Sequence, residues 1–299
     1  MHRFAARHWI LAALLTILFD GLAYGMLLFI LACGLSVTLG LMNFVNLAHG
    51  AFAMAGGYVC VLLTRHAHVS FVLTLPIAFA AMAAAGIVLE RLAYRRLYCR
   101  SHLDQVLFSI GLVFMASSAA SYCLGSGKQL VDLPDWLSRR IDFGPASLST
   151  YRLLIAVTCG VIALGLHLLV SRTQFGARLR AAVDNPQVAA GLGINVGQIF
   201  AVTFALGCGL AGLGGAMSAA LLGVDPGFPV EYMVYFLIVV TVGGSGNLGG
   251  ALCAALLLGI SDVAGKRYLP EAGAFIIYAV MVGVLIIRPN GLFAGAGGR

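Results

Sequence analysis

Charged residues are scarce in this chain. Only 10% of its 299 residues are Asp, Glu, Lys or Arg, whereas 61% are hydrophobic. A soluble domain is about 25% charged, so this chain lacks the polar side chains that a globule needs against water. The composition excludes a secreted enzyme, a soluble dehydrogenase and a disordered regulator. It places the chain in a lipid bilayer, and because the apolar runs are continuous rather than alternating, it indicates helices and not a barrel.

Signatures of covalent chemistry are also missing. The seven cysteines form no CxxC pair, which argues against a disulfide framework and a zinc site. The sequence has no HExxH, no Gly-x-Ser-x-Gly and no paired carboxylates within a helical turn. The GSGK stretch has Tyr122 in place of the first glycine of a phosphate loop, and Gln129 in place of its Ser or Thr. We therefore expect no enzyme activity, no cofactor and no metal site.

Acidic residues within the apolar runs are few. The candidates are Asp20, Glu231 and Asp262, and all three lie near the ends of runs. Ion-coupled transporters usually carry ionisable side chains within their spans. This scarcity argues against a secondary transporter driven by protons or sodium, which stays open as the alternative function.

Long apolar runs fill most of the chain. A bilayer-spanning helix needs about 20 apolar residues, and several runs are shorter, which predicts broken or re-entrant segments. We expect an all-α polytopic bundle of about eight membrane helices forming one domain over residues 1–299. The first 20 residues are interpreted as a retained anchor or half-helix. The later runs cover 22–41, 51–63, 70–89, 103–124, 152–171, 198–222, 232–243, 250–263 and 273–287.

Basic residues cluster at the ends of two apolar runs. The loop at 90–101 has four arginines, and the loop at 172–196 has three. Because Lys and Arg near span ends favour the cytoplasm, we expect both loops there, with the connection at 125–149 outside. Arg288 predicts a cytoplasmic C-terminus. The net charge of +7 is accordingly interpreted as membrane anchoring, and no nucleic-acid partner is expected.

Three polar residues follow the first long run in LMNFVNLAHG. Asn43, Asn46 and His49 recur at intervals of three. Polar groups at membrane depth cost free energy unless they are paired. Two interpretations stay open, and they are compatible: the side chains line a solute path, or they satisfy the backbone where a helix is interrupted.

Small residues recur at two places. Gly207, Ala211 and Gly215 are spaced by four residues, which lines one helix face and predicts close packing of a neighbouring helix, with a pore-lining face as the alternative. The segment VGGSGNLGGA matches the GxGxxG pattern of a dinucleotide site, but no strand–helix–strand unit follows it. In a membrane it predicts close helix approach or a helix break. Its three pattern residues are Gly244, Gly246 and Gly249.

The loop at 172–196 contains signals for a helix outside the bilayer. Asn185 can cap a helix, Pro186 fits its first position, and Gly191 or Gly193 can end it. The pattern predicts a short helix of about two turns. Orientation alone would not need these signals, so we favour a docking surface for a cytoplasmic partner over a loop that only fixes orientation.

Several segments, taken together, resemble the permease subunits of bacterial ABC importers for branched-chain amino acids, LivH type. They occur in the family's order and cover most of the chain except residues 98–171. The matching segments are GLSVTLGLMNFVNLAHGAFAMAGGYV (34–59), LERLAYRRL (89–97), FGARLRAAVDNPQVAAGLGINV (175–196), VGGSGNLGGALCAALLLG (242–259) and RPNGLF (288–293).

This resemblance implies a transport subunit in the bacterial inner membrane without an ATPase site of its own. Two cytoplasmic ATP-binding subunits would dock on the loop at 175–196, a second permease subunit would pair with this one, and a binding protein outside would deliver the solute. Urea and short amides stay open as other solutes of such permeases. The residues expected to form the ATPase-coupling loop are Gly176, Arg178, Arg180, Asp184, Asn185, Pro186, Ala189 and Gly193.

Overall fold

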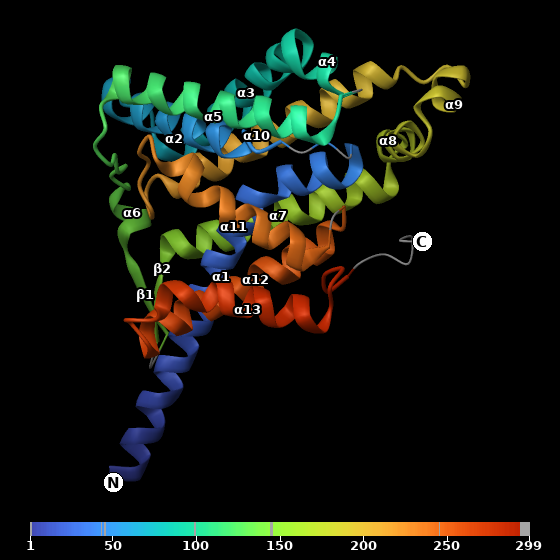
Figure 1. The fold of residues 1–299 in the computed structure, drawn as a ribbon. Coiled ribbons are helices and arrows are strands. Elements are labelled where there is room, and N and C mark those ends of the chain that lie inside the picture. The colour runs from blue at the N-terminus through green and yellow to red at the C-terminus, as the bar shows by residue number, and fades with distance from the viewer. Residues whose placement is uncertain are drawn as a thin grey trace.

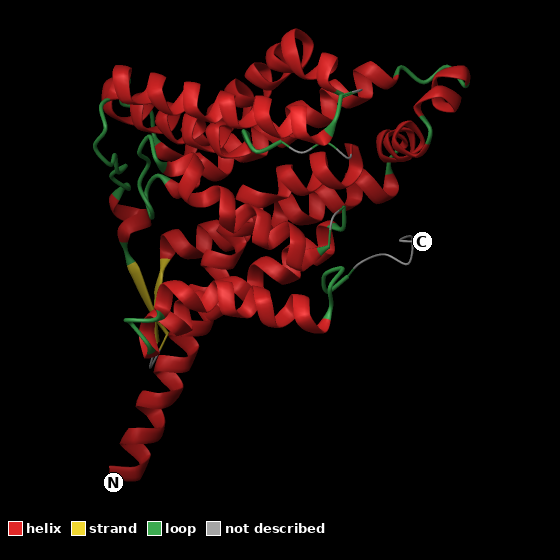
Figure 2. Ribbon diagram, in the orientation of Figure 1, coloured by secondary structure: helices red, strands yellow, loops and turns green. Residues whose placement is uncertain are grey.

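The computed structural model describes residues 2–42, 44, 46–98, 100–143, 146–244 and 246–293, and helices form nearly all of it (Figure 2). In chain order (Figure 1) the elements are α1 (His2–Met42), α2 (His49–His66), α3 (Phe71–Leu89), η1 (Glu90–Tyr94), α4 (Arg95–Leu97), α5 (His102–Leu124), α6 (Asp135–Ser138), β1 (Arg140–Phe143), β2 (Ala146–Ser149), α7 (Thr150–Arg172), α8 (Gln174–Asp184), α9 (Pro186–Gly191), α10 (Val196–Ser218), α11 (Phe228–Gly243), α12 (Leu248–Tyr268) and α13 (Gly273–Ile287).

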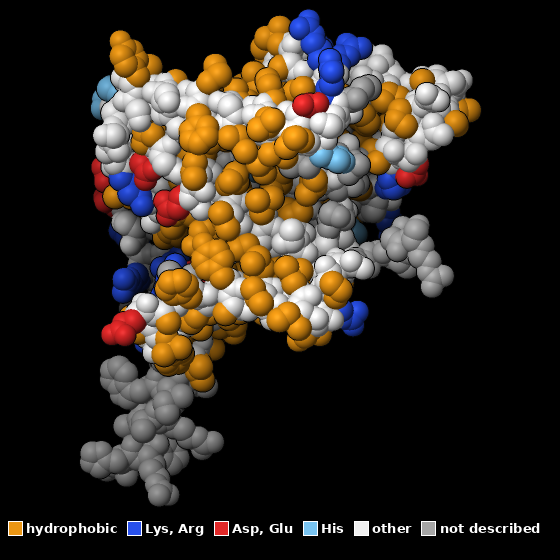
Figure 3. Space-filling view, viewed as in Figure 1, with side chains coloured by type: hydrophobic (Ala, Val, Ile, Leu, Met, Phe, Trp, Pro, Cys, Tyr) orange, Lys and Arg blue, Asp and Glu red, His pale blue; other side chains and the backbone are white. Residues whose placement is uncertain are grey.

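The helix lengths fit a membrane protein. Among the described residues, six helices are long and apolar enough to cross a bilayer, and two shorter apolar helices, Phe228–Gly243 and Phe275–Ile287, accompany them. Large apolar side chains such as Met115 and Ile286 stay more than 70% exposed, as lipid-facing residues do. Figure 3 shows an apolar face between two ends where the charged side chains gather. The predicted all-α polytopic bundle is confirmed.

The N-terminal segment differs from the expectation. α1 is one helix of 41 residues that continues through Asp20 and Gly21, where the sequence suggested the end of a separate segment. Asp20 forms an ion pair with Arg152 of α7, which lowers the cost of a carboxylate in the span. A Cβ on Gly21 would lie 2.6 Å from the Cα of Ile260. The glycine therefore permits contact with α12 and does not interrupt α1.

The loops divide between two ends of the bundle. In Figure 1, η1 with α4, the α8–α9 segment and the last turn of α13 lie at one end, which we call the α8–α9 end. The β1–β2 hairpin and α6 lie at the opposite end, which we call the hairpin end. This division agrees with the expected grouping of the loops at 90–101 and 172–196 on one side and the connection at 125–149 on the other.

The hairpin end is held by backbone and side-chain bonds. β1 and β2 are antiparallel, with Arg140 opposite Ser149. Gln129 pairs with Val224 in an isolated bridge, and the Arg65 guanidinium donates to Gln129 Oε1 at 2.6 Å. The long connection after α5 is thus attached both to the end of α2 and to the turn before α11.

The core lies around α1 and α10. Residues Leu27–Cys33 of α1 are at most 1% exposed. In each of these two helices, 78% of the most apolar 18-residue stretch is buried inside the protein. The corresponding share is 17% for α5 and α7. α1 and α10 are therefore central rods, whereas α5 and α7 lie at the periphery.

Candidate functional site

The junction between α1 and α2 contains two of the three predicted polar residues. Asn46 and His49 are each 1% exposed, whereas Asn43 lies outside the described residues. The Asn46 side-chain Oδ1 accepts from the backbone N–H of Ala48 at 3.1 Å and from the Tyr94 hydroxyl at 2.9 Å. The junction is therefore polar but enclosed by protein.

His49 links the start of α2 to the middle of α1. Its Nε2 lies 2.8 Å from the carbonyl oxygen of Leu31, and its ring meets Phe236 edge-on at 6.0 Å between centroids. Gly34 leaves room for this ring, since a Cβ there would lie 2.5 Å from His49 Cε1. The contacts of Asn46 and His49 agree with the interpretation that these side chains satisfy an interrupted backbone, and solute contact stays a prediction.

Small residues form a close seam along α10. A Cβ on Gly207 would lie 3.2 Å from the carbonyl oxygen of Gly34 in α1, and a Cβ on Gly215 would overlap the Ala53 carbonyl of α2. Ala211, one turn from each, is fully buried. The structure thus places the residues predicted for close packing against two neighbouring helices.

The glycine-rich segment between α11 and α12 is a break. Gly244 and Gly246 have positive φ angles of 91° and 81°, a backbone conformation that glycine adopts without strain. The backbone is also closely packed here, since a Cβ on Gly243 would lie 2.6 Å from Ala251 N and a Cβ on Gly291 would lie 2.7 Å from Gly244 N. Gly249 lines a cavity. The segment is therefore the helix break that the sequence left open beside close helix approach.

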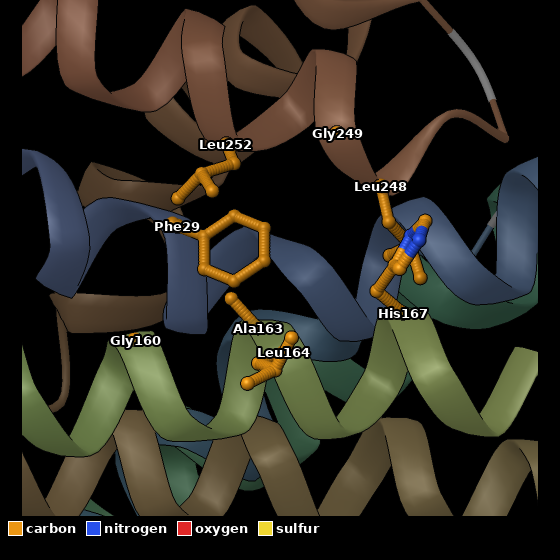
Figure 4. Close-up of a pocket in the computed structure, with 8 residues that line it drawn as sticks. All are labelled: Phe29, Gly160, Ala163, Leu164, His167, Leu248, Gly249 and Leu252. Atoms are coloured by element: carbon orange, nitrogen blue, oxygen red, sulfur yellow. The ribbon is translucent and has the colours of Figure 1, made fainter.

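That cavity has a volume of about 300 Å³ and lies between α1, α7 and α12 (Figure 4). Phe29 of α1 extends into it between the other two helices, and His167 of α7 points toward Leu248. The other lining residues are apolar or glycine: Gly160, Ala163, Leu164, Gly249 and Leu252. The cavity offers a charged solute little beyond one imidazole.

The loop at 172–196 folds into two helices. α9 confirms the predicted short helix: Asn185 Oδ1 accepts from the N–H groups of Gln187 and Val188, each at 3.1 Å, and Pro186 is the first residue. Gly193 follows with φ 83°. α8 was not predicted, although Thr173 caps it by accepting from Gly176 N at 3.3 Å. Thr173 is an N-cap signal in the sequence that could have predicted the start of α8.

α8 lies across the end of α7. Gly176 allows this crossing, because a Cβ there would overlap the Val170 carbonyl. The Arg180 guanidinium donates to the same carbonyl oxygen. Leu179 and Ala182 of α8 are buried, and α8 contacts α1, α7 and α10. The segment is thus joined to three helices of the bundle.

α9 presents an open surface. Ala189 is its buried anchor at 2% exposure, whereas Val188 and Leu192 are 58% and 76% exposed. Arg178 and Asp184 of α8 are also exposed. The α8–α9 segment thus exposes both apolar and charged side chains, and its use as a docking surface stays a prediction.

Two acidic residues of the spans have cationic partners. Asp20 bonds Arg152, and Asp262, only 2% exposed, accepts from Lys266 Nζ at 2.6 Å. The Lys266 ammonium lies 5.6 Å from the centre of the Tyr24 ring. These two carboxylates thus have cationic partners from the chain itself.

Comparison with known proteins assigns the family. A family model described as the permease component of branched-chain amino acid transport systems matches residues 17–285. The chain belongs to this family. It is 29% identical over 294 residues to the high-affinity branched-chain amino acid transport system permease protein BraD of Pseudomonas aeruginosa, covering 92% of this chain and 94% of BraD. No solved structure shows a significant match.

Two further relatives extend the comparison. A probable branched-chain amino acid transport permease protein LivH of Methanocaldococcus jannaschii is 28% identical over 296 residues, covering 92% of this chain and 91% of that protein. The LivM permease protein of Escherichia coli is 26% identical over 291 residues, covering 89% of this chain and 68% of LivM. The chain is thus similar to both permease types, and it is a transport component of a multi-pass membrane family.

Proposed function

We propose that this permease component moves branched-chain amino acids across the bacterial inner membrane as a subunit of an ATP-driven importer. A second permease subunit, a copy or a paralogue, pairs with this chain, and two cytoplasmic ATPases bind the α8–α9 ends of the pair. An external binding protein delivers the solute at the hairpin end. The chain itself carries out no covalent chemistry. The observation that carries the proposal is the α8–α9 segment, a capped and anchored pair of helices outside the bundle.

The segment has the features of a transmission element. It is joined to α1, α7 and α10, so a force on α9 reaches both central rods. Its outward surface presents Val188 and Leu192, which fit an apolar recess on a partner. ATP binding closes the ATPase pair, and the segment passes that movement to the bundle. Each state is favoured by a different ligand, nucleotide on one side and the loaded binding protein on the other.

The α1–α2 junction is the proposed solute path. A branched-chain amino acid has a zwitterionic head and an aliphatic side chain. The weakly polar side chains of Asn43, Asn46 and His49 beside apolar walls favour its passage without a deep well that would trap it. The family's relatives named for branched-chain amino acids support this solute class over urea and short amides.

The paired carboxylates argue against the ion-coupled alternative. A proton- or sodium-driven transporter needs an ionisable group that is free to exchange its partner during the cycle. Asp20 and Asp262 are instead held by Arg152 and Lys266. This observation favours ATP as the energy source.

The test is uptake into proteoliposomes containing the chain with its partner permease and ATPases. Leucine, urea and acetamide are compared as labelled solutes, with ATP on the α8–α9 side and ion gradients collapsed. We expect uptake of leucine that requires ATP and the binding protein. Uptake that persists without ATP and stops when a proton or sodium gradient is collapsed would overturn the proposal, and ATP-driven uptake of urea alone would overturn the solute.

Scrambling residues 174–195 tests whether the α8–α9 segment binds the ATPases. We expect the scrambled chain to lose both ATPase binding and energised uptake. A scramble of the exposed connection at 125–128, at the hairpin end, is the control and should retain ATPase binding. Intact assembly and uptake with the scrambled 174–195 segment would remove the basis of the proposal.

A further inference from the structure

A π-helical turn lies close to the α1–α2 junction. The five residues of η1, Glu90–Tyr94, connect α3 to α4. A π turn is rare, and such turns occur frequently at functional sites. Both ends of this turn are enclosed, since Glu90 is 1% and Tyr94 is 0% exposed. The Tyr98 hydroxyl donates to Glu90 Oε1 at 3.3 Å. Tyr94 at the end of the turn is thus buried, and Tyr98, four residues later, is half-buried beside it.

One side of these tyrosines meets α10. The Tyr94 ring lies 4.5 Å from that of Phe204, and the Tyr98 ring lies 5.5 Å from that of Phe200, between centroids. Phe200 and Phe204 are one helical turn apart, so both contacts are with the same face of α10. Any movement of this face displaces both tyrosine rings, because aromatic contacts at this distance leave no free space.

The other side of the tyrosines meets the α1–α2 junction. The Phe44 ring lies 5.3 Å from Tyr94 and 5.5 Å from Tyr98. The Tyr94 hydroxyl donates to Asn46 Oδ1, the same oxygen that accepts from Ala48 N at the start of α2. Among the described residues, the Asn46 Nδ2 has no hydrogen-bond partner. Tyr94 therefore supplies a bond that orients this buried amide.

α10 begins where the α8–α9 segment ends. Asn195, two residues after Gly193, caps α10 by accepting from Gln198 N at 3.1 Å. α8 also contacts α10. A displacement of the segment is thus a displacement of the first turns of α10, where Phe200 and Phe204 lie. A continuous set of contacts leads from the segment through α10 and the tyrosines to Asn46.

We infer that Tyr94 is a positioning residue of the transport cycle, which links the movement of α10 to the orientation of Asn46 at the α1–α2 junction. The inference rests on the proposed function, because it assigns the means by which the ATP-driven movement reaches the solute path. The ring of Tyr94 follows α10, and its hydroxyl carries that movement to the Asn46 amide. Tyr98 supports the arrangement through Phe200 and Glu90.

Tyr94→Phe isolates the hydroxyl, because it keeps the ring and its contact with Phe204. The experiment measures leucine uptake and ATP hydrolysis in the same proteoliposomes of the complete complex. We expect ATP hydrolysis to stay within about twofold of the wild type and leucine moved per ATP to fall about fivefold, as the loss of one buried hydrogen bond predicts. A merely structural role would lower both quantities together. The control is Tyr122→Phe, since Tyr122 is 92% exposed on α5.

A second variant tests whether the effect passes through Asn46. In an Asn46→Ser background, Tyr94→Phe should cause no further loss of leucine moved per ATP, because residues in one hydrogen-bond network are not additive. Unchanged coupling in Tyr94→Phe, equal losses of uptake and hydrolysis, or additive effects in the double variant would each overturn the inference. Failure of the proposed function would appear in the wild-type complex, as a lack of ATP-dependent leucine uptake. Failure of this inference would appear only in the variants.

Discussion

In the seam between α10 and α2, a single methyl group on Gly215 would overlap the carbonyl of Ala53. At the end of α9, by contrast, Leu192 directly after the helix is 76% exposed, and a Cβ on Gly191 would meet none of the described atoms within 4 Å. The seam is held by backbones in contact, with no space for additional atoms. The α8–α9 segment is held by a few buried anchors and leaves most of its surface open.

The contrast separates stability from coupling. In a bilayer, apolar side chains gain little by leaving lipid for protein, so close backbone contact provides much of the stability of the seam. Outside the bilayer, α8 and α9 depend on caps and on anchors such as Leu179 and Ala189. Substitutions in the seam should therefore affect folding, whereas substitutions on the open surface of α9 should affect partner binding.

The largest effect is expected from Gly215→Ala. The added methyl group would force α10 and α2 apart, which we expect to cost at least about 3 kcal/mol, the upper range for overpacked cores. Thermal unfolding of the purified protein in detergent, with the yield of monodisperse protein, measures the loss. The matched control is Gly111→Ala on α5, where a Cβ meets no described atom within 4 Å. A similar melting temperature for the two variants would show that the seam is not tightly held.

Much of the fold could be predicted because the bilayer imposes a strong pattern on the sequence. Continuous apolar runs predicted the helices, and the arginines near 90–101 and 172–196 grouped the loops correctly. The cap signals at Asn185 and Pro186 predicted α9, because capping is local chemistry. The polarity of Asn46 and His49 indicated an interruption after the first long run.

What could not be predicted depends on contacts between distant residues. Asp20 and Gly21 suggested a break, but the ion pair with Arg152 and the contact with Ile260 keep α1 continuous. The bond from Tyr94 to Asn46 joins residues 48 positions apart, and no local pattern shows it. The same holds for Gly246 and Gly249, whose spacing left close helix approach and a helix break both open. Their positions in the turn and at the cavity appear only in three dimensions.

An intermediate effect is expected from the double variant Val188→Ala with Leu192→Ala. If α9 docks on an ATPase, removal of two central apolar side chains should cost at least about 2 kcal/mol of binding, or roughly thirtyfold in affinity. Titration of the purified permease pair with the ATPase subunit measures it, and the melting temperature should stay unchanged. Val161→Ala with Leu168→Ala is the control, since both residues are exposed on α7. Unchanged ATPase affinity would assign the docking surface elsewhere.

The smallest effect is expected from removing one of two N-caps, those of α9 and α10. Both caps are asparagine side chains that accept hydrogen bonds of 3.1 Å. Asn185 caps the six-residue α9, and Asn195 caps the 23-residue α10. Loss of an N-cap costs about 1 kcal/mol. For α9 that cost is a large share of its local stability, since short helices are marginal. α10 is held by the core along its length.

Asn185→Ala should therefore accelerate hydrogen exchange at 187–192 and weaken ATPase binding a few-fold. Asn195→Ala should change exchange only in the first turn of α10. Equal effects of the two variants on ATPase binding would show that α10 contributes to ATPase binding as much as α9 does. The separation of the α8–α9 segment, for partner binding, from the α10 seam, for stability, would then be wrong.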